Sequence, residues 1–200
     1  MSATEQSARD AILAAVREAR PPAVARVEAP APTPMVGSSG RSLTDVFTAA
    51  AVASGADVTV CSRDDVARVI EAALAGARSV LSFSDFAPSR QCPPSDLHAL
   101  AALDALVCDT TLGVAENGAV WIASSSDRLR AALFLAARVV VVVMEKDLVD
   151  DLHAAYARID VRAHPFGAFV AGPSKTADIE QSLVIGAHGP KALSIVVVRT

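Results

Sequence analysis

Three short segments of the chain carry the residue types that acid–base chemistry or anion binding needs. In the first, Glu116-Asn117-Gly118 lies between two short apolar runs, residues 112–115 and 119–123. Asn-Gly is a strong signal for a two-residue type I′ hairpin, because both residues tolerate positive φ. Glu116 is then either a solvated flank of the turn or a carboxylate beside strand ends, placed to act as a nucleophile or base. Gly118 is a ligand-binding candidate in the same turn.

The second segment, residues 172–176, follows a predicted strand and precedes a predicted helix over residues 177–185. Ser174 or Thr176 can cap that helix, and Asp178 complements the positive end of its dipole. These structural roles account for the segment completely. An anion site accounts for it equally well, because amides at a helix start and nearby hydroxyls bind anions.

In that anion site the amides after Gly172 and the side chain of Lys175 join the two hydroxyls as ligand-binding candidates. Asp178 and Glu180 are further candidates. About 200° separates these two carboxylates on a regular helix, so both cannot face one ligand.

The third segment, residues 186–190, contains His188 between glycines in a tight loop before the last predicted strand. Such a histidine is either structural or a candidate for proton transfer. Gly189 is a ligand-binding candidate beside it. We expect Glu116, His188 and the segment 172–178 to line one pocket.

Several cofactor sites are not indicated by the sequence. No Gly-x-Gly-x-x-Gly follows a predicted strand, so a dinucleotide site of that type is unsupported. Cys61, Cys92 and Cys108 are too widely spaced for an iron–sulfur or zinc pattern, and the four histidines lack metal-ligand spacing. We therefore expect no metal and no redox cofactor in this chain.

Composition excludes several classes of protein. A chain of 200 residues is about one domain's worth, and its 20% of charged residues is ordinary for a globular protein. A net charge of −4 gives no support to nucleic-acid binding. The longest apolar stretch, residues 131–144, is interrupted by Arg138 and is shorter than the roughly 20 residues of a membrane span. We expect no membrane span and a cytoplasmic location.

Predicted strands and helices alternate from residue 42 onward. The strands are expected at residues 57–61, 79–83, 105–108, 139–144, 168–171 and 193–198, and the helices at 42–54, 64–75, 96–103, 127–136, 147–158 and 177–185. This alternation predicts an α/β fold, a mainly parallel sheet sandwiched by helices, with one β-hairpin at residues 112–123. In such sheets ligands bind outside the carboxyl ends of the strands.

The first 41 residues form a separate region. Residues 4–20 are predicted to be a helix, and five prolines between 21 and 34 followed by Gly37-Ser38-Ser39-Gly40 predict a linker. We divide the chain into a helical arm with a Pro/Gly-rich linker, residues 1–41, and an α/β domain, residues 42–200. The arm has too narrow an apolar stripe for a core of its own, so we expect it to dock on another surface.

The segments 115–143 and 171–190 together resemble the LUD-domain family, and within it chains of the lactate utilization protein C type. The resemblance covers most of residues 42–200. It implies the fold shared by glucosamine-6-phosphate deaminase, ribose-5-phosphate isomerase and CoA transferases. It also implies a role in oxidising L-lactate to pyruvate, beside partner proteins that carry iron–sulfur clusters.

Three functions remain open at this point. The first is a non-redox component of an L-lactate oxidation system, with a small anionic ligand and iron–sulfur partners. The second is acyl or CoA transfer with Glu116 as the nucleophile, because Glu116-Asn117-Gly118 resembles a Ser-Glu-Asn-Gly motif of CoA transferases, with Ala115 in place of the serine. The third is a regulatory module that binds a small anion without turnover.

Overall fold

The computed structural model describes residues 3–21, 40–91, 97–176, 184–186 and 188–199. By its contacts the chain divides into two compact units, Met1–Pro32 and Thr33–Thr200. The first contains α1 (Ala3–Glu18), which confirms the helix predicted near residues 4–20. The other described helices and strands belong to the second unit. No helix in the described ranges combines the length and apolar character needed to cross a membrane.

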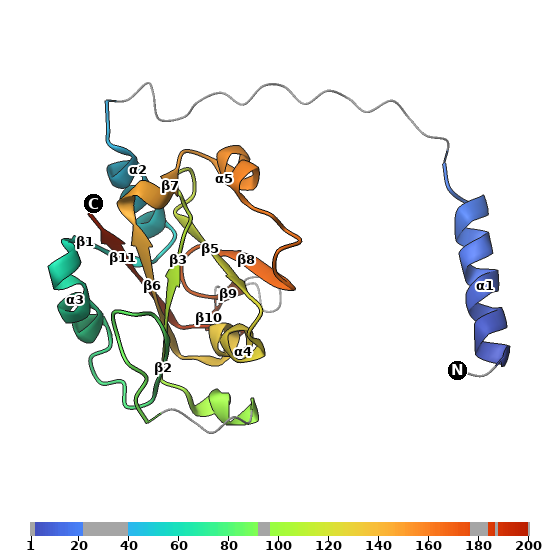
Figure 1. Ribbon diagram of the computed structural model, residues 1–200, viewed down its shortest axis with the longest axis horizontal. Helices are drawn as coiled ribbons and strands as arrows, with labels where there is room; N and C mark the ends of the chain where they lie inside the picture. Colours follow the sequence, from blue (N-terminus) through green and yellow to red (C-terminus); the bar gives the residue numbers. More distant parts are fainter. Residues whose placement is uncertain (1–2, 22–39, 92–96, 177–183, 187, 200) are drawn as a thin grey trace. The chain divides into compact units, whose positions relative to one another are not determined.

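Five strands form the main sheet of the second unit, in the order β1-β11-β6-β3-β2 (Figure 1). Every neighbouring pair is parallel, which confirms the predicted α/β class. The central strand β6 is mostly valine, and its residues 139–143 are at most 1% exposed because both faces of the sheet are covered. The strands are β1 Asp57–Cys61, β2 Val80–Phe83, β3 Ala105–Thr110, β6 Arg138–Met144 and β11 Ala192–Val198.

Successive side chains of these strands point into two different hydrophobic cores, one on each face of the sheet. On one face, Val107 and Val140 lie in a core with Ile70 of α3 (Val66–Ala73). On the other face, Leu106 lies in a core with Phe47 of α2 (Leu43–Ala53), with α4 (Asp127–Leu135) and with the second sheet. Figure 1 shows these layers, with α3 on one side of the sheet and α4 on the other.

A second, four-stranded sheet has the order β7-β4-β5-β8. Its strands are β4 Gly113–Val114, β5 Ala119–Ser124, β7 Leu148–Val149 and β8 Phe166–Val170. The antiparallel pair β4–β5 confirms the predicted hairpin. The predicted turn type is wrong: Val114 pairs with Ala119, so the turn has four residues, and Gly118 but not Asn117 has a positive φ.

The segment after residue 174 also differs from the prediction. Val184–Ile185 (β10) pairs antiparallel with Lys175–Thr176 (β9), so the helix predicted to reach residue 185 is wrong at that end. Its remainder, residues 177–183, lies outside the described residues. Thr176 pairs with Val184 in this two-stranded ribbon, and its predicted capping role stays a prediction.

Two other predicted helices are shorter than expected. Only Leu152–Arg158 (α5) is helical in the segment 147–158, because Leu148 and Val149 pair with β4 instead. Asp151 caps α5 by accepting a hydrogen bond from the Ala154 amide at 2.7 Å. In the segment 96–103, the described part forms a 3₁₀ turn at His98–Ala102, and two more such turns, Arg63–Asp65 and Glu145–Asp147, follow β1 and β6.

Replacement of Gly118 tests how closely the hairpin approaches α2. Gly118 has φ +68°, and a Cβ there would lie 2.2 Å from the Ala51 amide nitrogen, whereas Gly76 has φ +81° with open space around it. We expect Gly76→Ala to cost about 1–2 kcal/mol from backbone strain, and Gly118→Ala to cost roughly 1–3 kcal/mol more from the clash. Chemical denaturation of both variants measures the difference; equal losses would contradict the close approach.

Candidate functional site

The last turn of α2 is where two of the predicted segments meet. A Cβ on Gly118 would collide with the Ala51 backbone, and a Cβ on Gly172 would lie 2.0 Å from the Ser54 carbonyl oxygen. The Ser54 hydroxyl also donates a hydrogen bond to the Asn117 carbonyl at 3.3 Å. The packing of loop backbone against a helix therefore explains both glycines without a ligand.

Lys175 belongs to the same cluster. Its ammonium group donates a hydrogen bond of 2.6 Å to the carbonyl of Ser54, which is the C-cap of α2. A cation is favourable at a helix C-terminus, because the last carbonyl groups there carry partial negative charge. The structure thus gives Lys175 a partner other than the predicted anion, and its ligand-binding role stays a prediction.

Ser174 and the His188 loop are neighbours, as expected. The Ser174 amide donates to the Pro190 carbonyl at 2.9 Å, and a Cβ on Gly189 would lie 2.9 Å from the Ser174 Cβ. His188 is exposed. Its loop lies at the amino ends of the strands, because the Lys191 amide donates to the carbonyl of residue 137, just before β6.

Glu116 is exposed, and its carboxylate holds a different helix. Glu116 Oε2 accepts a hydrogen bond of 3.0 Å from the amide of Leu152, the first residue of α5. The Glu116 amide donates to the Asp150 carbonyl at 2.9 Å. This pair of contacts fixes the hairpin turn against the start of α5.

The predicted residues therefore do not share one described pocket. His188 and Gly189 line a cavity with Phe134 and Leu135, and Glu116 is not part of its described lining. The loops gather around α2 and at the amino ends of the strands, whereas ligands of such sheets bind at the carboxyl ends. Asp178 and Glu180 lie outside the described residues. The catalytic and binding roles of all ten candidates stay predictions.

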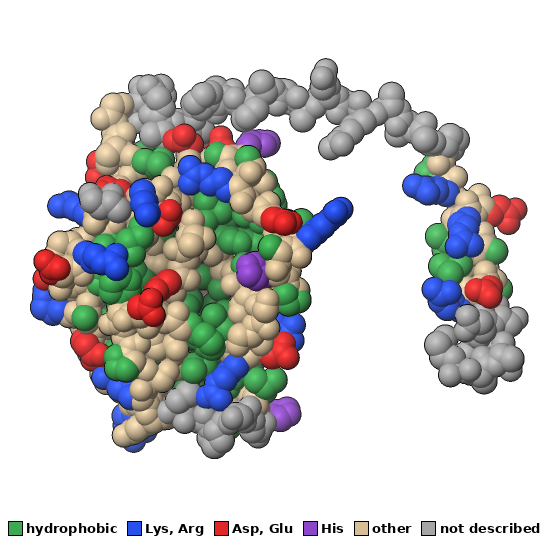
Figure 2. Space-filling model, in the orientation of Figure 1, with side chains coloured by type: hydrophobic (Ala, Val, Ile, Leu, Met, Phe, Trp, Pro, Cys, Tyr) green, Lys and Arg blue, Asp and Glu red, His purple; other side chains and the backbone are tan. Residues whose placement is uncertain are grey.

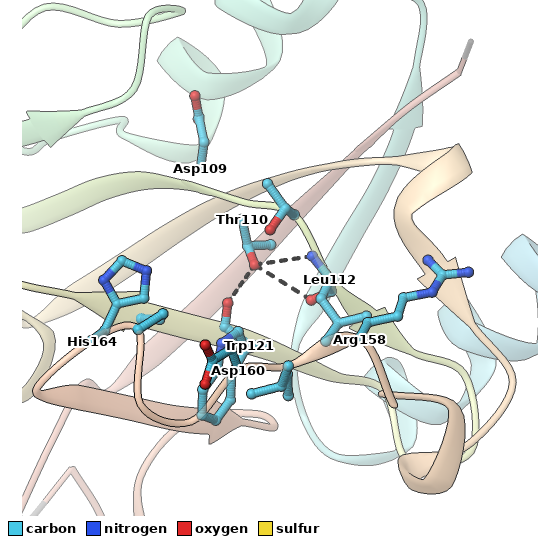
Figure 3. Close-up of a pocket in the computed structure, with 11 residues that line it drawn as sticks. Asp109, Thr110, Leu112, Trp121, Arg158, Asp160 and His164 are labelled. Atoms are coloured by element: carbon cyan, nitrogen blue, oxygen red, sulfur yellow. Dashed lines mark hydrogen bonds between the residues drawn. The ribbon is translucent and has the colours of Figure 1, made fainter. Parts of the chain in front are cut away.

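A cavity of about 450 Å³ lies where β3 ends and the chain turns into the second sheet. Its volume falls in the range of small-molecule sites. Figure 3 shows the side chains around it, which come from the end of β3, from β5, and from the segment between α5 and β8. Its lining comprises residues 109–112, Trp121, Ala123, residues 158–160, Ala163 and His164.

Thr110 fixes the wall of this cavity. Its buried hydroxyl donates to the Trp121 carbonyl and accepts from the Leu112 amide at 3.3 Å (Figure 3). The Trp121 amide in turn donates to the Leu112 carbonyl at 3.0 Å. These bonds use the single proton of the Thr110 hydroxyl and position β5 relative to β3. The neighbouring Thr111 is exposed.

Charged and titratable side chains reach the cavity from the segment after α5. Arg158 is the last residue of α5, and within the described part of the chain its guanidinium forms no ion pair. Asp160 Oδ1 accepts from the Arg162 amide at 2.9 Å, which shapes the turn that carries His164. Figure 3 shows Arg158 and His164 on opposite sides of Asp160 and Trp121.

This arrangement can bind an anion and move a proton. An unpaired guanidinium takes a carboxylate or phosphate group in a bidentate fashion. The imidazole of His164 lies 3.4 Å from the Ser125 hydroxyl through Nδ1, and its ring nitrogens can donate or accept a hydrogen bond. Among the described residues, no three His, Cys, Asp or Glu side chains are grouped as a metal site would require.

Sequence reasoning missed this cavity. Asp109, Thr110 and Thr111 come directly after the apolar strand predicted at residues 105–108, and polar residues at that place are a usable signal for a ligand site. Arg158 and His164 gave no such signal, because they reach the cavity through the packing of α5 on β4 and β7 and the pairing of β8 with β5.

Asp109 stands at the rim of the cavity on the other face of β3. Figure 3 shows its carboxyl group directed away from Thr110. Partial burial raises the pKa of this carboxyl group, and the nearby charge of Asp85 adds to the effect, while hydrogen bonds from the Ser84 hydroxyl and the Asp85 amide oppose it. In contrast, the pKa of Asp104 is lowered, chiefly because the amides of Ser79 and Arg78 donate to its carboxylate.

These two aspartates should give opposite pH dependences of stability. A raised pKa in the folded state means that the folded chain binds more protons than the unfolded chain. The contribution of Asp109 to the free energy of unfolding therefore falls as the pH rises through the pKa values of the two states. As the pH rises from 3 to 7, Asp109→Asn should therefore become more stable relative to wild type. Over the same rise, Asp104→Asn should become less stable relative to wild type. Urea denaturation across this range measures both trends, and the same sign in the two variants would contradict the assignment.

Charged side chains of both signs are interspersed over the visible face of the domain, with hydrophobic groups between them (Figure 2). The residues described on that face do not form a large positively charged patch of the kind that binds nucleic acid.

Comparison with known proteins supports the resemblance found in the sequence. The chain is 35% identical over 96 residues to lactate utilization protein C of Geobacillus kaustophilus, covering 45% of this chain and 39% of the relative. It is 38% identical over 95 residues to the protein of that name from Shouchella clausii, covering 44% and 41%. The matched part thus spans about two fifths of the length of these relatives.

A solved structure shares the fold. A DUF162 family protein from Deinococcus radiodurans superposes with a TM-score of 0.57 at 21% identity, over 78% of this chain and 96% of that one. The family model of the LUD domain matches residues 96–198. This range contains β5, α5 and every strand of the main sheet except β1 and β2. Because that match covers more than half of the sequence, the chain belongs to the LUD domain family.

Proposed function

We propose that this chain is a non-redox component of an L-lactate utilization system. Oxidation of lactate to pyruvate releases two electrons and two protons, and in this proposal partner proteins with iron–sulfur clusters take the electrons. The observation that carries the proposal is the LUD-domain match over residues 96–198, together with relatives that are named for lactate utilization. The matched region supplies the whole cavity at the end of β3.

Within this role the cavity holds an anionic ligand. Arg158 binds the anionic group, and His164 exchanges a proton on the opposite side of Asp160. The ordered backbone around Thr110 keeps Trp121 in place between them.

The helix α1 is the proposed docking element for a partner. Ile12 and Val16 lie one turn apart on this helix and are 65% and 62% exposed. Apolar side chains in that arrangement form the stripe by which amphipathic helices enter a groove of another protein.

An add-back experiment tests the role in lactate oxidation. We expect extract of lactate-grown cells that lack the chain to regain lactate-dependent dye reduction when the purified wild-type chain is added. Arg158→Gln should restore tenfold less activity or worse, because the anion loses its guanidinium partner. Arg162→Gln, in the same loop but outside the cavity lining, is the matched control and should restore wild-type activity. Normal activity without any added chain would contradict the proposal.

Glu116→Gln separates the structural role of Glu116 from the nucleophilic one. An amide oxygen still accepts the hydrogen bond from the Leu152 amide, but it cannot attack an acyl-CoA thioester. We expect this variant to restore full activity in the same extract, and the mass of the wild-type chain to stay unchanged after incubation with acyl-CoA and hydroxylamine. Modification of Glu116 would establish acyl transfer instead.

A further inference from the structure

The tryptophan of the cavity lies on a surface built to hold it. Trp121 is half-buried on β5, and its ring crosses over Gly167 of β8, where a Cβ would lie only 2.3 Å from the indole Cζ2. Phe169 packs beside the ring, with centroids 4.8 Å apart and a tilt of 52°. The indole is therefore fixed against the second sheet, and Trp121 lines the cavity.

A fixed aromatic surface borders the same space as a cation that has no ion-pair partner among the described residues. Arg158 and Trp121 both line the cavity, and Arg158 extends to one side of the ring (Figure 3). His164 lies on the other side, and the carboxylate of Asp160 lies between Arg158 and His164 in this view. Because the carboxylate of Asp160 repels anions, the negatively charged end of a ligand belongs at Arg158.

The cavity is also large for lactate. Six non-hydrogen atoms occupy about 90 Å³, three times the share of a water molecule in the liquid. The cavity measures about 450 Å³, several times that volume. Lactate alone would leave the indole surface without a partner.

We propose that the cavity binds an anion that bears an aromatic ring, with the anionic group on Arg158 and the ring stacked on Trp121. This inference rests on the proposed anion site but not on a role in lactate oxidation. The anionic group is a carboxylate or a phosphate, since a guanidinium accepts either.

The chain offers a direct reporter, because Trp121 is its single tryptophan. Tryptophan emission, excited at the red edge of the band, and calorimetry can follow two matched pairs of probes: L-lactate with phenyllactate, and inorganic phosphate with AMP. In at least one pair we expect saturable quenching and roughly tenfold tighter binding for the ring-bearing member, as aromatic stacking supplies. The pair that responds identifies the anionic group.

Variants assign the two contacts. Arg158→Gln should weaken the binding of the ring-bearing probe at least tenfold, while Arg162→Gln should bind this probe with wild-type affinity. By calorimetry, Trp121→Phe should keep the preference for the ring and Trp121→Leu should lose it. If Trp121→Leu does not fold, the Arg158 and Arg162 pair and the wild-type titrations still decide the question.

Three results would overturn the inference: equal affinity within both pairs, binding without a change in Trp121 emission, or unchanged binding in Arg158→Gln. None of these requires the lactate-oxidising system, so the outcome is separate from that of the add-back experiment. Restored lactate oxidation with equal affinity within the pairs would leave the proposed function standing and remove the aromatic ligand.

Discussion

The hydroxyl of Thr110 makes the hydrogen bonds on which the rest of the site depends. At this residue the chain leaves the carboxyl end of β3, a parallel strand whose other residues except Asp109 are buried, and enters a second sheet. Buried backbone groups at such a turn need partners, and the hydroxyl supplies them by bridging the Leu112 amide and the Trp121 carbonyl. The position of β5 follows from this bridge. The pairing of β8 with β5 then brings the segment after α5 to the end of β3.

Residues whose types suggest catalysis or ligand binding in the sequence can instead form hydrogen bonds that stabilise the fold. Glu116 satisfies a free amide at the start of α5, and Lys175 satisfies a free carbonyl at the end of α2. Both are helix termini, where backbone groups lack partners within the helix and charged side chains are favourable. Charge and a nearby glycine therefore do not distinguish a ligand site from a helix end.

The strands of the main sheet could be predicted because each is a short apolar run between breaking residues. The segment 147–158 shows where this approach fails. Its apolar residues have helical spacing, but Leu148 lies beside Gly113, whose missing side chain leaves room for the leucine, so a strand pairing replaces the first turns of the helix. The cavity was missed for a related reason. Arg158 and Trp121 are 37 positions apart, and the packing of α5 on β4 and β7 brings them to the same cavity.

Gly167 has an effect on strand register as well as on the ring above it. The indole of Trp121 needs a position on β8 that has no side chain, and Gly167 is the sole glycine of that strand. Sliding β8 by one residue would place Phe166 or Ala168 under the ring, and sliding it by two would place Pro165 or Phe169 there. Each of these carries a Cβ that the ring excludes, whereas hydrogen bonding alone would tolerate some of the shifted pairings. The glycine thus acts against misalignment of the second sheet, and it ties the correct alignment to the presence of the tryptophan.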